Sequence, residues 1–130
     1  MYPVVAARAA HRCEYCRTPE QVVGYRLELD HIVPTSSGGG ATADNLALAC
    51  VQCNRAKGAR TEAQDPATGR RVPLFNPRRQ QWEDHFRWSA TYRSIFGKTD
   101  TGRATVAALR MNDRYRRRAR VHWRRLGLIP

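Results

Sequence analysis

Two pairs of cysteines, each with a two-residue spacer, are the residues of this chain best suited to binding a metal. They are Cys13, Cys16, Cys50 and Cys53. Such a spacer lets two thiolates converge on one ion from a tight turn, and two pairs complete the tetrahedral set that Zn²⁺ prefers. Redox-active pairs and disulfides are the alternatives. We favour structural zinc, because we find no secretory signal and a reducing cytosol disfavours disulfides.

Between the two pairs lies a second group of residues, whose donor atoms suit a harder metal ion. Asp30 offers a carboxylate and Asn54 an amide oxygen, and these donors favour Mg²⁺ or Mn²⁺ over Zn²⁺. His31 follows Asp30 directly, and a neutral imidazole can take a proton from water near pH 7. Taken alone, the Asp-His pair is more simply the exposed end of a strand. Together, the three residues predict metal-dependent hydrolysis of a phosphodiester.

The excess of basic residues indicates a polyanionic partner. Lys and Arg number 23 against 11 Asp and Glu, a formal net charge of +12, which four thiolates and one Zn²⁺ would reduce to about +10. DNA is the partner that we expect, and an anionic membrane surface is the less favoured alternative. Because no apolar run approaches the ~20 residues of a membrane span, we expect a cytoplasmic protein that does not act at a membrane.

A strand, a loop and a helix are needed to bring these candidate residues together. Alternating apolar residues over 23–30 predict a strand that ends at the Asp-His pair. Proline and three glycines within 34–40 predict a loop. Residues 53–57 predict the first turns of a helix, and an alanine-rich helix over 3–11 precedes the first cysteine pair.

After position 60 we expect a basic and mainly helical extension. A short hairpin over 88–96 precedes a helix that begins near residue 101, and Asn112 or Asp113 caps a last helix. One face of the last helix is apolar, and we expect this seam to be buried. The seam consists of Tyr115, Ala119, Trp123 and Leu126.

The opposite face of the last helix is rich in arginine, which suits phosphate groups, although a merely solvated face is the alternative. Basic residues also follow the second cysteine pair. The residues that we expect to contact nucleic acid are Arg55, Lys57, Arg60, Arg116, Arg117, Arg120 and Arg124.

Four short segments between positions 29 and 58 occur in a distinctive order and spacing. They are residues 29–34 (LDHIVP), 38–40 (GGG), 44–46 (DNL) and 50–58 (CVQCNRAKG). Together they resemble the HNH endonucleases with the ββα-metal fold, in the subgroup braced by two Cys-x-x-Cys zinc knuckles. The resemblance covers roughly residues 11 to 60, and the rest of the chain has no comparably specific match.

The resemblance implies a role for each matching residue. His31 would be the general base, Asp30 and Asn54 the ligands of the catalytic Mg²⁺ or Mn²⁺, and Asn45 the residue that ties down the loop and orients the base. Asn54 stands where many members have histidine, which should weaken the binding of softer metals. Lys57, about one helical turn beyond Asn54, would reach a phosphate, with a plain surface lysine as the alternative. Cleavage would leave 5′-phosphate and 3′-hydroxyl ends.

We therefore predict an α+β fold with a small ββα-metal core over residues 1–60, braced by the four-cysteine zinc site. A basic, mainly helical extension over residues 61–130 would pack on this core. The predicted function is metal-dependent hydrolysis of DNA. A non-catalytic zinc-knuckle module that binds DNA is one alternative, and an RNA-directed nuclease or RNA-binding protein is another.

Overall fold

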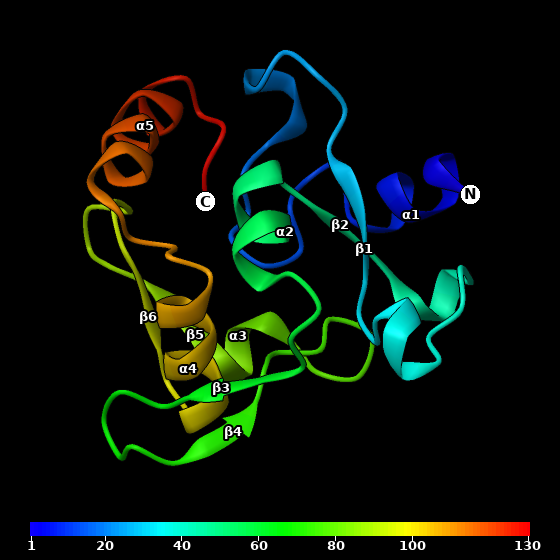
Figure 1. The fold of residues 1–130 in the computed structure, drawn as a ribbon. Coiled ribbons are helices and arrows are strands. Elements are labelled where there is room, and N and C mark those ends of the chain that lie inside the picture. The colour runs from blue at the N-terminus through cyan, green and yellow to red at the C-terminus, as the bar shows by residue number, and fades with distance from the viewer.

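Two antiparallel strands and one helix form the part of the fold that carries the candidate site. In the computed structural model, which describes residues 1–130, these elements are β1 (Glu28–His31), β2 (Leu46–Ala49) and α2 (Val51–Lys57). The two strands pair so that Asp30 lies opposite Ala47. Figure 1 shows α2 between the β1–β2 pair and the C-terminal half of the chain. The arrangement is the predicted ββα unit within an α+β fold.

The other elements surround this unit, and each is short. The helices are α1 (Tyr2–Arg8), α3 (Trp82–His85), α4 (Asp100–Ala108) and α5 (Arg114–Arg125). The strands are β3 (Glu62–Gln64), β4 (Arg71–Pro73), β5 (Phe86–Trp88) and β6 (Ile95–Gly97). Single 3₁₀ turns span Glu20–Val22, Thr35–Ser37 and Ala43–Asn45. None of the helices is long and apolar enough to cross a membrane.

The strand predicted over 23–30 is shorter than expected and begins only at Glu28. A strand extends only as far as its partner, and β2 offers four residues before Cys50 caps α2. Upstream, Gly24 adopts a left-handed conformation with a φ of 74°, and Tyr25 is half exposed. The alternating residues 23–27 therefore form a turn and an irregular segment that leads into β1.

Residues after position 60 include two hairpins as well as helices. The hairpin predicted over 88–96 is confirmed, because β5 pairs with β6 and Trp88 lies opposite Ile95. The hairpin formed by β3 and β4 has no counterpart in the sequence analysis, since strands of three residues are too short to show a period. The predicted caps are confirmed at α5, where the Asp113 side chain accepts hydrogen bonds from two N–H groups of the first turn.

A single core joins the two halves of the chain. One cluster of 24 buried residues runs from Val5 to Met111 and contains the four cysteines. Tyr15 illustrates the junction, because its ring meets Phe75 edge-on at 6.5 Å and its carbonyl accepts a 2.8 Å hydrogen bond from the Trp82 indole. Residues after position 60 thus complete the apolar surroundings of the knuckles and of β2.

Candidate metal centre and nuclease site

The four cysteines converge on one point, and all of them are buried. Their sulfur atoms lie within 4.8 Å of one another, with Cys16 Sγ and Cys50 Sγ 3.6 Å apart, and no disulfide joins them. A Zn–S distance of about 2.3 Å places the sulfurs of a tetrahedral site about 3.8 Å apart. The cluster therefore fits a four-thiolate zinc site, as the spacing of the cysteines predicts.

Local structure explains why the two pairs face each other. The first pair lies in the turn after α1, where the Cys16 N–H donates to Cys13 Sγ at 3.4 Å. The second pair begins α2, where Cys50 is the N-cap and its sulfur accepts from the Cys53 N–H at 3.4 Å. Burial raises the pKa of the Cys13 and Cys53 thiols well above the ordinary value. Because zinc binds thiolates, metal uptake here must release protons.

A buried arginine from the C-terminal helix completes this centre. The Arg116 side chain donates from Nη2 to Cys53 Sγ at 3.0 Å and to Cys50 Sγ at 3.7 Å. Its Nη1 donates to the carbonyls of Leu109 and Arg110 at 2.8 and 3.2 Å. Burial lowers the pKa of this guanidinium, but the cysteine sulfurs raise it by more than burial lowers it, so the net shift is upward. The positive charge of Arg116 would partly offset the charge of a doubly negative zinc tetrathiolate.

Asp30 lies on β1 with its carboxylate turned into the protein and only 3% exposed. The Tyr15 hydroxyl donates to it at 2.7 Å, and Lys57 Nζ lies 3.2 Å from it. Burial raises the pKa of Asp30, and Lys57 and Tyr15 lower it only in part. Lys57 Nζ lies 3.2 Å from both carboxylate oxygens, so these contacts leave at least one of the about four acceptor positions of an ionised carboxylate.

The Lys57 side chain does not point towards solvent, where a contact with a phosphate was predicted. Its side chain is 2% exposed, and its ammonium group donates to Asp30 Oδ1 and to the His31 carbonyl at 3.1 Å. The prediction that Lys57 contacts a phosphate is wrong for this conformation. The reason is helix geometry, since Lys57 stands three residues after Asn54 and shares its face, which packs on β1.

Asn54 reaches β1 through a residue that the sequence analysis did not single out. Its amide nitrogen donates to Glu28 Oε1 at 2.8 Å, which leaves its amide oxygen without a protein partner. Glu28 stands two residues before Asp30, so strand alternation places both carboxylates on the side of β1 that faces α2. The alternation could have identified Glu28 as a neighbour of the site. Glu28, Asp30 and Asn54 together supply hard oxygen donors, which fit Mg²⁺ or Mn²⁺.

His31 ends β1 with a half-exposed ring that makes no hydrogen bond to the protein. The loop beyond it is held by Asn45, whose side-chain oxygen accepts from the Val33 N–H and whose amide nitrogen donates to the carbonyls of Val33 and Gly40, all at 2.9 Å. Gly39 packs so tightly here that a Cβ atom would lie 1.8 Å from the Val33 carbonyl oxygen. Asn45 therefore fastens both ends of the loop that follows the histidine.

Some of the arginines predicted to contact nucleic acid are buried and bound to other protein groups, and others are exposed. Arg116 and Arg120 are 4% and 1% exposed. Arg120 donates to the carbonyls of Met111 and Arg93 at 2.6 and 2.9 Å. The prediction that these two contact nucleic acid directly is therefore wrong, because the protein encloses both guanidinium groups.

Other predicted contacts remain available to solvent in part or in full. Arg55 is exposed and makes no side-chain hydrogen bond, and Arg60 is exposed but donates to the Ala56 and Ala108 carbonyls. Arg117 is partly buried and donates to Ser94 Oγ at 2.9 Å, and Arg124 is exposed and donates to the Thr91 carbonyl at 3.2 Å.

Comparison with known families identifies the segment that contains these residues. Residues 13–60 match the family model of the HNH endonucleases. The match spans both cysteine pairs, β1, β2 and α2, and it covers under half of the chain. It confirms the resemblance inferred from the motifs, and members of this family are generally nucleases. Neither the curated proteins nor the solved structures that were searched include a match to the chain.

Proposed function

We propose that this protein is a metal-dependent endonuclease that hydrolyses DNA. The observation that supports the proposal is the packing of α2, which carries Asn54, on β1, which carries Asp30 and His31, inside the segment that matches the HNH endonucleases. Two side-chain contacts link these elements, from Asn54 to Glu28 and from Lys57 to Asp30. The net charge of +12 favours a polyanionic substrate.

Asp30 and Asn54 are the residues that would hold Mg²⁺ or Mn²⁺. Each retains an oxygen acceptor after its contacts within the protein are counted. When bound, the divalent ion would orient the scissile phosphate and neutralise charge that develops on the leaving oxygen. Lys57 supplies a fixed positive charge beside Asp30, which favours the ionised form of that buried carboxylate.

His31 is the general base in this proposal. Its partly exposed ring takes a proton from water, the water oxygen forms a bond to phosphorus, the bond from phosphorus to the 3′ oxygen breaks, and the released 3′ oxygen takes a proton from solvent. The products are a 5′-phosphate and a 3′-hydroxyl. Asn45 fastens the adjacent loop at Val33 and Gly40, so it acts on the orientation of His31 and not on the substrate.

Zinc at the four cysteines has a structural role in the proposal. The cluster is fully enclosed by protein, which leaves no open ligand position for chemistry. It joins the turn after α1 to the first residue of α2, and it thereby fixes the helix that carries Asn54.

Cleavage of supercoiled plasmid with Mg²⁺ or Mn²⁺ tests the proposal. We expect nicking by the wild-type protein, no nicking by His31→Ala, and wild-type nicking by His122→Ala, a matched control at an exposed position of α5. Zinc content and circular dichroism should be unchanged in both variants. Full activity in His31→Ala would disprove the assignment of the base. A wild-type protein that binds DNA but cuts it with neither ion would favour the non-catalytic alternative.

A further inference from the structure

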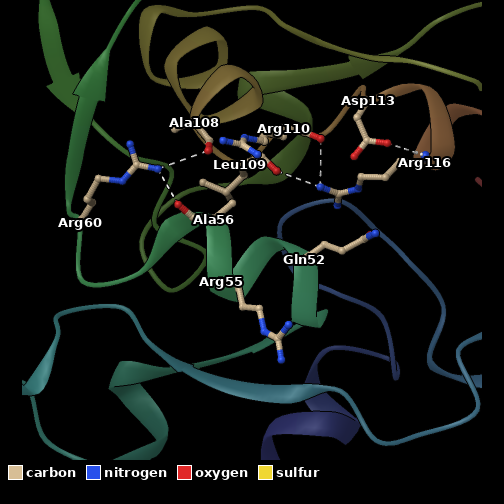
Figure 2. A pocket seen from close by; sticks show the side chains of 9 residues that line it. All are labelled: Gln52, Arg55, Ala56, Arg60, Ala108, Leu109, Arg110, Asp113 and Arg116. Carbon is tan, nitrogen blue, oxygen red and sulfur yellow. Dashed lines mark hydrogen bonds between the residues drawn. The ribbon is translucent and has the colours of Figure 1, made fainter.

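A basic pocket lies on the side of α2 that faces away from β1. Its volume is about 430 Å³, and it lies between α2 and the turn that connects α4 to α5. Figure 2 shows Arg60, Arg110 and Arg116 along the α4–α5 side of this pocket and Arg55 extending from α2. Four arginines thus line one pocket, two from residues 55–60 and two from residues 110–116, and Figure 2 shows the Arg55 guanidinium directed away from the other three.

Three of the four arginines of this pocket have no anionic partner, whereas Arg116 faces the sulfurs of Cys50 and Cys53. Asp113 is the only acidic lining residue of the pocket, and the Asp113 carboxylate accepts hydrogen bonds from the N–H groups of Tyr115 and Arg116 at the start of α5. None of the four arginines forms an ion pair with a carboxylate. Like charges held together without a counter-ion create a strong local attraction for anions.

Two of the four arginines keep all of their guanidinium donors free. Arg55 and Arg110 are exposed and make no side-chain hydrogen bond. Arg110 stands in a left-handed conformation with a φ of 52°, at the point where the chain turns out of α4. Arg60 donates from Nε and Nη2 to backbone carbonyls, and its Nη1 remains free. Arg116 donates to a backbone carbonyl and adds its positive charge to the lining of the pocket. Free planar guanidinium groups suit phosphate oxygens, which they can bind in pairs.

We propose that this pocket binds a backbone phosphate of the nucleic acid whose cleavage is proposed above. The choice of polymer rests on that proposed function. Asn54 and Lys57 contact β1, whereas the two residues between them, Arg55 and Ala56, line the pocket. The two sites are therefore separated by the width of one helix, about 10–12 Å. The bound phosphate therefore lies within a few nucleotides of the cut.

Salt dependence of duplex binding tests this pocket without requiring cleavage. The affinity of a short DNA duplex is measured by fluorescence anisotropy at several KCl concentrations, with no added Mg²⁺ or Mn²⁺. We expect Arg55→Gln and Arg110→Gln each to reduce the slope of log affinity against log salt by about 0.9. Arg118→Gln is the matched control, because Arg118 is exposed on α5 outside the pocket, and we expect its slope to equal that of the wild type.

The outcomes separate this proposal from the proposed nuclease activity. The proposed phosphate site would be overturned, even if the protein cuts DNA, by salt slopes that are unchanged in both pocket variants. It would also be overturned if Arg118→Gln reduced the slope as much as the pocket variants do. The expected slopes in a protein that cuts no DNA would support the pocket and refute the nuclease. A third experiment measures the binding of adenosine monophosphate to the wild type and to Arg110→Gln. If Arg110→Gln abolishes this binding but leaves the salt slope of duplex binding unchanged, the pocket binds free nucleotides and the proposal is overturned.

Discussion

Replacing Arg116 by methionine should weaken zinc binding at the four-cysteine site by about 10- to 100-fold. Arg116 Nη2 lies 3.0 Å from Cys53 Sγ and 3.7 Å from Cys50 Sγ, and its side chain is 4% exposed. A hydrogen bond to a charged group contributes about 1.5–3 kcal/mol, and about 1.4 kcal/mol corresponds to a tenfold change in affinity. The resulting range agrees with that typical of residues that hydrogen-bond to metal ligands, about 10- to 100-fold.

Competition between the protein and a chromophoric zinc chelator, in reducing buffer, measures this effect. Methionine preserves an unbranched stem of similar length but removes the donors. Arg118→Met is the matched control, since Arg118 lies on the same helix, is exposed, and does not contact the cysteines. Arg116→Lys should fall between the two, because it keeps the charge and loses the planar fork.

Stability and zinc affinity must be read separately, because Arg116 Nη1 also donates to the Leu109 and Arg110 carbonyls. Thermal unfolding of the zinc-saturated protein reports on those two contacts. A variant with lowered stability but the same zinc affinity as Arg118→Met would refute the reasoning, since it would show that the contacts to sulfur contribute nothing to metal binding.

Three further changes have expected outcomes. Lys57→Met should destabilise the protein by about 3–5 kcal/mol in urea unfolding, because it leaves the Asp30 carboxylate buried and unpaired; an unchanged midpoint would contradict the ion pair. Arg103 holds the pKa of Asp65 at about 2, below the ordinary ~3.9, so this pair stabilises the fold above pH ~4 and loses its effect as the pH falls towards about 2. Asp65→Asn should reduce that acid dependence in unfolding measurements from pH ~5 to ~2, and an identical pH profile would exclude the pair as its source. Gly39→Ala should lower the melting temperature and the rate of DNA nicking, because its Cβ would overlap the Val33 carbonyl; a wild-type melting temperature and rate would show that the loop adjusts freely.

The metal-binding residues were predictable because their spacing alone constrains their geometry. A Cys-x-x-Cys pair has few ways to present two sulfurs, so the convergence of Cys13 and Cys50 follows from the pattern once both pairs bind one ion. The ββα unit was predictable only through the resemblance to the HNH endonucleases, since the residues themselves indicate the strand that ends at His31 and the helix near Cys53 but not the second strand.

The partners of the acidic residues were harder to predict, although helix and strand periods contain part of the answer. Asn54 and Lys57 are three residues apart and share a face of α2, and Glu28 and Asp30 share a face of β1. A periodic argument shows that the four side chains occupy two surfaces. It does not show that these surfaces meet, because the packing of α2 on β1 depends on long-range contacts.

The last helix shows where an amphipathic argument fails and why. The predicted apolar seam of α5 is largely outside the core, with Tyr115 60% and Leu126 70% exposed, whereas Arg116 and Arg120 are buried. Such arguments assume that a buried face must be apolar, because an unpaired buried charge is costly. Here the surface under α5 consists of cysteine sulfurs and the carbonyls that end α4, all of which accept hydrogen bonds. A tetrathiolate site therefore reverses which face of a nearby basic helix packs inward, and the arginines on that face are removed from the set available to nucleic acid.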